Sequence, residues 1–310
     1  MPNYRIHGLT VQTDIELPAL IHEPSGKVDL RVRLGPVRRV SNRRPRGTLM
    51  AHAIFDGGVG FAHVRTRQGY LLRYFSRCEA ALSSGIDEIE LHLDPRCSGP
   101  AWSSLFLAGG IFAFLLSLRG EVPIHASAVK YGGRTLAFAG SSGAGKSTLA
   151  ALFCTQGAQL LADDLLVIND AGMAHVGAQE LRLRPAAGAL AGWFAPGHRT
   201  TSVDGRTVVA AAQAPPEAAP VSALIAPVLI EGTPDIQMRR LSGSQAFLAV
   251  ATAPRQLGIV DTQMQRQQFG KLARLVNCLP VIEARIPLAR LRQPEMAVEL
   301  FDKIQRELVR

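Results

Sequence analysis

The chain has 310 residues, a length that suits two domains better than one. Apolar residues make up 47% and charged residues 19%, which excludes an intrinsically disordered chain. The formal net charge is +9, from 34 basic and 25 acidic side chains, and scattered surface arginine is its simplest source. The densest basic cluster lies in a loop-like stretch without aromatic residues and consists of Arg38, Arg39, Arg43, Arg44 and Arg46. Because bases find no aromatic platform there, we predict no nucleic-acid partner, although an acidic peptide or a phosphate group would fit these charges.

The cysteines, the N-terminus and one apolar stretch bear on the compartment. The N-terminus lacks the basic-then-apolar pattern of a signal peptide. Residues 101–118 are nearly long enough to span a bilayer, but three serines and two adjacent glycines favour a buried core helix. The spacing of the four cysteines is typical of neither a metal site nor a redox motif, so we predict free thiols in a reducing compartment. The four are Cys78, Cys97, Cys154 and Cys278. We therefore predict a soluble, cytoplasmic protein without a membrane partner.

Residues 1–98 are predicted to form a β-rich N-terminal domain, smaller than the domain that follows. Alternating apolar and polar residues, the pattern of half-buried strands, occur at 28–34, 60–65, 70–75 and 86–93. Gly57-Gly58 and Ser83-Ser84-Gly85 are predicted to form turns between them. No cluster of residues in this domain indicates chemistry, so substrate docking is the role we hypothesise for it.

Residues 99–310 are predicted to form an α/β domain. After the helix at 101–118, the expected elements are strands at 124–129 and 135–139, a helix at 147–153 and a strand at 159–162. Further along, we expect a surface loop at 210–220, a strand at 221–230, and helices at 244–251 and 263–278.

The pattern G-x-x-x-x-G-K-[ST] is matched in full from Gly140 to Ser147, between the expected strand at 135–139 and the expected helix at 147–153. Glycines let successive N–H groups face a phosphate chain, and the start of a helix favours negative charge. Lys146 is expected to reach the outer phosphates of ATP, and Ser147 to bind Mg²⁺. The predicted nucleotide contacts are Gly140, Ser141, Ser142, Gly143, Ala144, Gly145, Lys146, Ser147 and Thr148.

Two further features are candidates for catalysis. Asp163-Asp164 ends an apolar strand downstream of the loop, where one carboxylate would hold Mg²⁺ and the other would accept a proton from a hydroxyl. An acidic turn after a strand is the structural alternative. His125 precedes the strand that leads into the loop, and a single histidine at such a position is more often structural than functional.

The order of these residues resembles the catalytic domain of the HPr kinase/phosphorylase family. The matched features are His125, the glycine-rich loop and Leu161-Ala162-Asp163-Asp164, with His125 21 residues before Lys146 and Asp163 17 residues after it. The resemblance is good over about 121–185 and weak over the remainder of the C-terminal half. It implies an α/β P-loop fold similar to phosphoenolpyruvate carboxykinase, and phosphorylation of a protein serine with ATP and Mg²⁺. It also implies that Asp163 is the general base, that Asp164 and Ser147 serve the metal, and that His125 lies near the transferred phosphate.

The sequence departs from this family at two places. Ser141 stands where the family often has an acidic residue, and Glu180-Leu-Arg-Leu-Arg184 stands where the family has Glu-Ile-Arg-Gly. Glu180 and Arg182 are therefore weak candidates, and phosphorylase activity and hexameric assembly stay open. Tyr4-Arg-Ile-His-Gly-Leu-Thr10, together with 125–129, is similar to HPr-kinase-like proteins of peptide biosynthesis clusters. Some of those kinases modify a serine of a lasso-peptide precursor.

A serine kinase is the leading hypothesis. The alternatives are an ATP-sensing regulator or scaffold with little turnover, the HPr kinase/phosphorylase proper, and an ABC transporter ATPase. Leu241-Ser-Gly-Ser-Gln245 is similar to the ABC signature, but Thr262 follows Asp261 where that family needs a glutamate. We therefore expect 241–245 to begin a helix. The predicted partner is a protein or peptide with an acceptor serine, and the sequence leaves its identity and homo-oligomer formation open.

Overall fold

The structure, a computed structural model, describes residues 1–19, 21–22, 27–55, 60–232, 235–253 and 255–309. The turn predicted at Gly57-Gly58 lies outside these residues. Contacts divide the chain into an N-terminal unit, Met1–Val122 with Arg255–Phe269, and a C-terminal unit, Pro123–Pro254 with Gly270–Arg310. The division therefore falls after Val122 rather than after residue 98, and a segment from late in the sequence joins the first unit.

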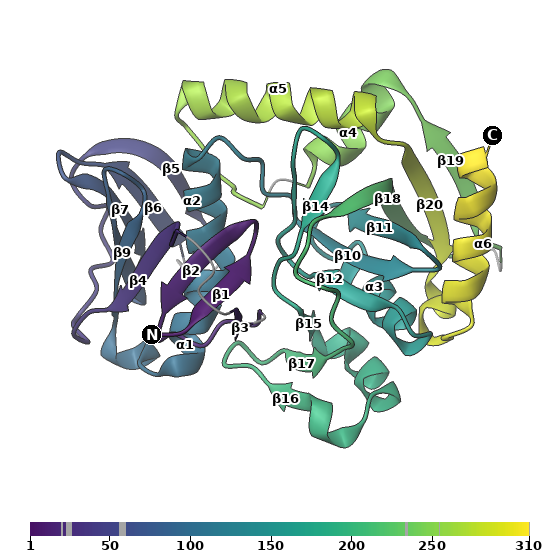
Figure 1. The fold of residues 1–310 in the computed structure, drawn as a ribbon, viewed down its shortest axis with the longest axis horizontal. Helices are drawn as coiled ribbons and strands as arrows, with labels where there is room; N and C mark the ends of the chain where they lie inside the picture. Colours follow the sequence, from purple (N-terminus) through teal and green to yellow (C-terminus); the bar gives the residue numbers. More distant parts are fainter. Residues whose placement is uncertain (20, 23–26, 56–59, 233–234, 254, 310) are drawn as a thin grey trace. The chain divides into compact units, whose positions relative to one another are not determined.

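The described part of the N-terminal unit contains a nine-stranded sheet in the order β3-β1-β2-β4-β9-β8-β7-β6-β5 (Figure 1). In β4, Leu30 and Val32 are buried while Arg31 and Arg33 are exposed, which is the alternation the sequence predicted. β5 to β9 follow one another as antiparallel neighbours, whereas β4 pairs in parallel with β2 and β9. The strands are β1 (Asn3–Ile6), β2 (Leu9–Thr13), β3 (Ile21–His22), β4 (Leu30–Leu34), β5 (Thr48–Ile54), β6 (Gly60–Arg65), β7 (Gly69–Tyr74), β8 (Cys78–Ser83) and β9 (Glu88–Leu93).

The apolar stretch after β9 forms a helix that belongs to this first unit (Figure 1). It runs through α1 (Pro100–Phe106), a π-helical turn (Leu107–Ile111) and α2 (Phe112–Leu118), after a short 3₁₀ turn, η2 (Pro95–Cys97). By length and composition it could cross a membrane, yet half of its most apolar window is buried. The ring of Phe114 contacts that of His63 on β6, with centroids 4.5 Å apart. The helix was predicted to open the second domain, but its buried face covers the first unit's sheet, as a core helix does.

A segment near residue 260 completes the far edge of the same sheet. The amide of His52 on β5 donates to the carbonyl of Gly258 at 2.8 Å, and the amide of Val260 donates to the carbonyl of Met50 at 2.9 Å. Arg65 on β6 pairs with Asp261 at 3.8 Å. Since β5 is the last strand in the sheet order, this segment satisfies backbone groups that the edge would otherwise present to solvent.

The C-terminal unit is built on an eight-stranded sheet, counted over the described residues, with the path β12-β10-β11-β18-β14-β13. β20 pairs with β18, and β19 pairs with β20. The central pairs β11–β18 and β18–β20 are parallel, and the other pairs are antiparallel. The strands are β10 (Ala126–Tyr131), β11 (Arg134–Ala139), β12 (Gln159–Ala162), β13 (Val167–Ile168), β14 (Met173–His175), β18 (Ala219–Ile230), β19 (Gln237–Leu241) and β20 (Val281–Pro287).

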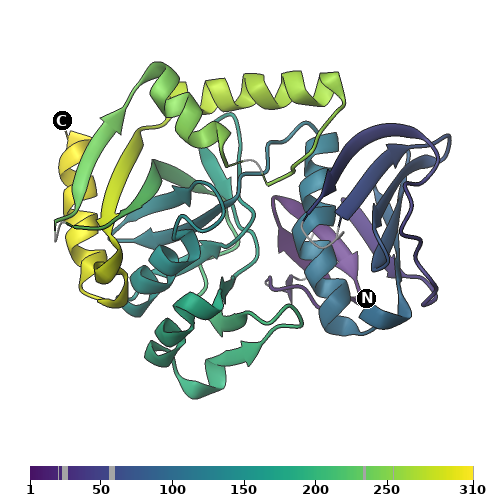
Figure 2. The ribbon, with the colours of Figure 1, turned by 180° about the vertical axis from the view of Figure 1, so that it is seen from behind.

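Two helices, α3 (Lys146–Thr155) and α6 (Met296–Val309), pack against each other and close the main core of this unit (Figure 2). In α6 the buried residues recur at helical spacing, as at Met296, Leu300 and Ile304. Aromatic side chains join the two helices to the sheet, because the ring of Tyr131 lies 5.4 Å from Phe153 and 4.9 Å from Phe301. α4 (Gly243–Ala251) and the 3₁₀ turn η6 (Leu288–Arg292) also belong to this unit. The division between the two units falls inside α5 (Thr262–Cys278), between Phe269 and Gly270. α4 and α5 confirm the helices predicted at 244–251 and 263–278.

A separate three-stranded sheet, which the sequence did not predict, follows β14 in the chain. Its central strand is β17, and all its pairs are antiparallel. Leu181 and Leu183 of its first strand are buried and lie in the same core as α3. The elements are β15 (Glu180–Leu183), β16 (Arg199–Thr201), β17 (Thr207–Ala210) and the 3₁₀ segments η4 (Pro185–Trp193) and η5 (Pro196–His198).

Candidate active site

The glycine-rich loop joins the end of β11 to the start of α3, in the strand–loop–helix order that the sequence predicted. Gly143 and Gly145 have φ values of 90° and 89°, in the left-handed region that side chains with a Cβ adopt at a cost. The space itself would admit a Cβ at both positions, since the nearest atom to one at Gly145 is a Leu229 methyl carbon at 3.5 Å. The backbone conformation, not crowding, therefore calls for glycine here.

Two cationic side chains contact the loop. Lys146 is only 5% exposed, and its Nζ donates to the carbonyl oxygen of Ser141 at 2.7 Å. Arg184, just after β15, donates from Nη2 to the hydroxyl of Ser142 at 2.5 Å. Ser141, Ser142 and Gly143 are exposed, so the rim of the loop is open to solvent. The open rim, the N-terminus of α3 and two cations together form a site suited to an anion.

Asp163, the first carboxylate after β12, is bound by three donors. Its side chain is buried, and Asp163 is 1% exposed. Oδ1 accepts hydrogen bonds from the hydroxyls of Ser127 at 2.5 Å and Ser147 at 2.8 Å. Oδ2 accepts one from the backbone amide of Arg182 at 2.9 Å. Asp163 therefore ties together four segments: β10, α3, β15 and the end of β12.

Strand register explains why Ser127 meets Asp163 although 36 residues separate them. β10 pairs with β12 at Ala128 and Ala162, and Ile124 exchanges two backbone hydrogen bonds with Leu166, at 2.8 and 2.9 Å. Between these two pairs, Ser127 lies opposite Asp163. Ser127 is the one polar residue in the buried run 126–129 of β10, and this was the sequence signal that could have identified it.

The chain turns sharply between the two aspartates. Asp164 has a φ of +69°, and the amide of Leu165 donates to the carbonyl of Asp163 at 2.9 Å. This positive-φ three-residue turn is rare and strained, and such strain concentrates at functional sites. Its effect is to send the two carboxylates to different partners. Asp164 Oδ1 lies 3.3 Å from His125 Nε2, and both side chains are about a quarter exposed (26% and 25%).

Burial is the largest influence on Asp163, and it raises the pKa of this carboxyl above its usual range. The hydrogen bonds from Ser127, from the Arg182 amide and from Ser147 act in the opposite direction, because they stabilise the ionised form. The neighbouring charge of Asp164 raises the pKa further. An ionised Asp163 is therefore costly without a cation, and a nearby divalent cation would remove that cost.

The structure brings most of the predicted site residues together. The loop from Gly140 to Ser147, Asp163, Asp164 and His125 are linked by the contacts above, and Thr148 lies half-buried in the first turn of α3. Of the two weak candidates, Arg182 contributes its backbone amide, while its guanidinium bonds Ser202 and Asp204. Glu180 opens β15, the strand that carries Arg182. Sequence reasoning did not assign Ser127 or Arg184 to the site.

The donor set fits Mg²⁺ and a phosphate chain. Mg²⁺ prefers oxygen ligands and is usually held by one or two carboxylates together with substrate phosphates, and Ser147 and Asp163 present a hydroxyl and a carboxylate side by side. Among the described residues, no group of three or more His, Cys, Asp or Glu side chains is placed to hold a metal ion by itself. The four cysteines are free thiols.

Comparison with known proteins adds no family to this description: no protein-family model matches the chain, and no curated protein matches it significantly.

Proposed function

We propose that this chain is an ATP- and Mg²⁺-dependent kinase, with an HPr kinase-like P-loop domain, that phosphorylates a serine of a protein or peptide. The observation that carries the proposal is the 2.8 Å hydrogen bond between Ser147 and Asp163. It couples a phosphate-binding loop to a pair of carboxylates, which is the minimum that phosphoryl transfer requires. The acceptor classes we favour are HPr-type proteins and lasso-type precursor peptides, in the cytoplasm and without nucleic-acid or membrane partners.

The contacts favour Asp163 for the metal and Asp164 for the acceptor, the reverse of the roles that the family resemblance implies. Asp163 is buried and contacts the hydroxyl of Ser147, which is the ligand pair that holds Mg²⁺ in phosphate-loop enzymes. The bound metal would neutralise charge on the outer phosphates. Asp164 is more exposed and faces His125, so it is better placed to take the proton of an incoming serine.

Lys146 and Arg184 would serve the phosphates. Lys146 already lies over the loop through its bond to Ser141. Arg184 reaches the loop from β15, whose position is fixed by the Arg182 amide on Asp163. An arginine supplied from within the chain stabilises charge that develops in the transition state, and losses of about 10³-fold or more in rate follow its removal in enzymes that use one.

The test compares binding with transfer. Affinity for Mg²⁺-ADP is measured by calorimetry, and transfer of labelled phosphate from ATP is measured to HPr and to a lasso precursor peptide. We expect Asp164→Asn to lower the transfer rate by about 10²–10⁴-fold with nucleotide affinity unchanged. We expect Asp163→Asn to raise the Mg²⁺ concentration needed for nucleotide binding. Lys146→Ala should weaken nucleotide binding by about ten- to a hundredfold.

Three results would count against parts of this proposal. Unchanged nucleotide affinity in Lys146→Ala would remove the ATP site itself. Tight nucleotide binding without phosphoserine on either acceptor would leave an ATP-sensing regulator or scaffold as the better function. A transfer defect confined to Asp163→Asn, with normal Mg²⁺ dependence, would restore the general-base role to Asp163.

A further inference from the structure

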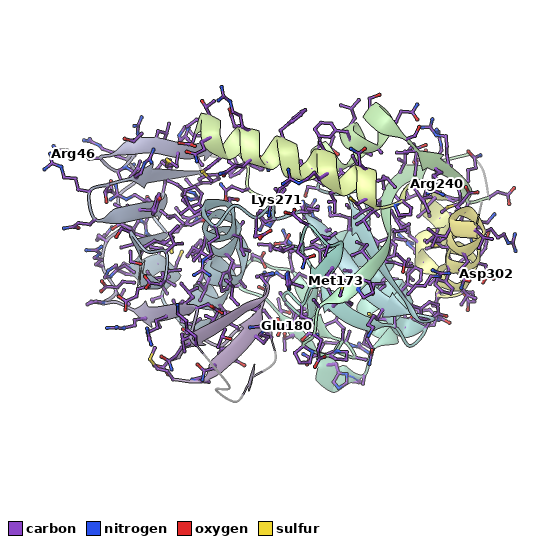
Figure 3. All side chains as sticks on the ribbon, turned by 45° about the horizontal axis from the view of Figure 1, so that its top comes forward. Arg46, Met173, Glu180, Arg240, Lys271 and Asp302 are labelled. Carbon is purple, nitrogen blue, oxygen red and sulfur yellow. The ribbon has the colours of Figure 1, made fainter. Side chains whose placement is uncertain are left out.

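The loop between β4 and β5, residues 35–47, is the most basic segment of the N-terminal unit and is here called the arginine loop. It holds five arginines and no acidic residue. Most of its residues are exposed, and the side chain of Arg46 projects outward from the unit (Figure 3). A charged loop of this kind would not indicate a binding surface if its backbone were mobile or if neighbouring carboxylates neutralised its charge. Neither condition holds.

Backbone hydrogen bonds fix the arginine loop along β9. The amide of Gly35 donates to the carbonyl of Leu91 at 2.9 Å, and the amide of Arg38 donates to the carbonyl of Leu93 at 3.0 Å. The amide of Val40 donates to Asp94 Oδ2 at 2.9 Å, and Val40 itself is buried. The loop is therefore held in one conformation before any partner arrives, which lowers the entropy cost of binding.

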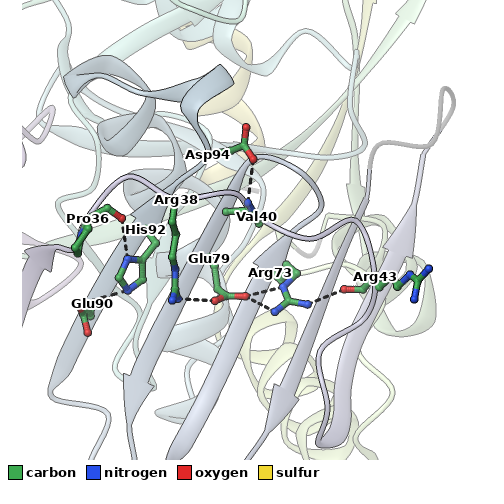
Figure 4. A network of polar contacts seen from close by, with 9 residues as sticks. All are labelled: Pro36, Arg38, Val40, Arg43, Arg73, Glu79, Glu90, His92 and Asp94. Atoms are coloured by element: carbon green, nitrogen blue, oxygen red, sulfur yellow. Dashed lines mark hydrogen bonds and ion pairs between the residues drawn. The ribbon is translucent and has the colours of Figure 1, made fainter.

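Only part of the positive charge is compensated, and Figure 4 shows the contact of Arg38 with Glu79. Glu79 is shared between Arg38 at 2.8 Å and Arg73 at 2.5 Å. Asp94 bonds Arg96 at 2.7 Å, and this contact together with the Val40 amide holds the pKa of Asp94 well below its usual range.

Four arginines of the loop have no carboxylate partner among the described residues. Arg44 donates to the neutral carbonyl of Gly47, so its charge also stays uncompensated. Within the part of the chain that the structure describes, the guanidinium groups of Arg39, Arg43 and Arg46 bond no other group. The backbone carbonyl of Arg43 accepts from Arg73 at 2.9 Å, which fixes this arginine's main chain while its own side chain stays exposed.

We propose that the arginine loop is a docking surface for an acidic peptide segment of a partner protein. Leu34 and Val37, beside the arginines, are 51% and 55% exposed and offer apolar contacts of the kind that peptide side chains use. No aromatic ring lies in the loop to stack a base, which disfavours nucleic acid. The arginine fork binds carboxylates in two-point fashion, which suits Asp and Glu side chains. This inference does not depend on the proposed kinase activity.

The experiment measures binding of a short fluorescent peptide of glutamate and leucine residues by anisotropy, using the full chain. The variant Arg39→Gln/Arg43→Gln/Arg46→Gln removes the three arginines whose guanidinium groups bond no other described group. A matched control removes three exposed arginines elsewhere, so that both variants have the same net charge; these are Arg67→Gln, Arg266→Gln and Arg306→Gln. Binding is compared at about 0.02 M and 0.15 M salt, over which surface charge interactions weaken. A peptide with glutamine in place of glutamate, a single-stranded oligonucleotide and phosphatidylserine vesicles are the other probes.

We expect the loop variant to bind the acidic peptide between about threefold and a hundredfold more weakly, and the control variant to bind like the parent. The glutamine peptide should not bind. Equal losses in the two variants would mean that net charge alone attracts the peptide, and this would overturn the proposal. Tighter, loop-dependent binding of the oligonucleotide or of the vesicles would overturn it in favour of that partner. Circular dichroism and thermal unfolding serve as folding controls, and they should be the same in all three proteins.

Discussion

Replacing Ser127 with alanine tests the buried serine–aspartate contact on which the site depends. The Ser127 hydroxyl donates to Asp163 at 2.5 Å, and both residues are buried. A hydrogen bond to a charged group contributes about 1.5–3 kcal/mol, so the C-terminal unit should lose about 2 kcal/mol of unfolding free energy. Thr155→Ala in α3, where the hydroxyl bonds the neutral carbonyl of Leu152 at 2.7 Å, is the control and should lose about 1 kcal/mol.

The same change acts on the ionisation of Asp163. The Ser127 bond stabilises the carboxylate, so its loss raises the pKa of Asp163 further. If Asp163 must be ionised to hold Mg²⁺, the pH below which Mg²⁺-ADP binding fails should rise in Ser127→Ala and stay unchanged in Thr155→Ala. Because the chain has two units, stability is best followed by hydrogen exchange of peptides from β10 to β12. A stability loss below about 0.5 kcal/mol, or a pH limit that moves downward, would refute the reasoning.

Three further changes test the loop and the first unit. Gly145→Ala should weaken nucleotide binding and cost about 1 kcal/mol of stability, because φ is +89° there. Its control is Gly157→Ala, at φ +86° after α3, which should cost a similar amount of stability and leave nucleotide affinity intact. Calorimetry measures the affinity and urea unfolding measures the stability. Gly110→Ala should destabilise the N-terminal unit, since its Cβ would lie 2.2 Å from the Tyr74 hydroxyl, and Tyr74→Phe, which removes a buried hydroxyl that bonds no described group, should partly rescue it in thermal unfolding. Asp94→Asn should destabilise the same unit at neutral pH. The difference in unfolding free energy from the parent should shrink as pH falls below about 3.9, because the folded-state pKa of Asp94 lies under the unfolded value. Trp102 fluorescence in a Trp193→Phe background measures the unfolding, and a difference that persists undiminished in acid would contradict the prediction.

Local patterns in the sequence identified the elements that carry the loop. The apolar run of β11, the glycines after it and the helix that follows are contiguous, so propensity and spacing were enough to predict them. The strands β4, β6, β7 and β9 were predictable for the same reason, since each shows its own alternation. β20 and the three-stranded sheet around β17 were not predicted, because their buried faces are defined by distant segments. α6 was missed although Met296, Leu300 and Ile304 already recur at helical spacing in the sequence.

Contacts between distant segments determine those features of the site and of the fold that local sequence patterns could not predict. The partners of Asp163 come from three other elements, and only the strand register places Ser127 opposite it. Nothing in the sequence distinguishes the environment of Asp163 from that of Asp164. The positive φ of Asp164 directs its carboxylate to a more exposed position, while that of Asp163 is buried. The helix at 100–118 was assigned to the wrong side of the division because its apolar face does not reveal which sheet it covers.

The order of synthesis matters for the edge strand β5. The backbone groups that pair with Met50 and His52 belong to residues 258–261, so the N-terminal unit is not contiguous in the chain. A ribosome that has finished residue 122 must add roughly 140 more before this edge is covered, which takes about 7–28 seconds at ~5–20 residues per second. During that interval the edge can pair with other nascent chains. A fragment of residues 1–122 would keep the edge open permanently, so cutting this protein after Val122 would yield a fragment that self-associates.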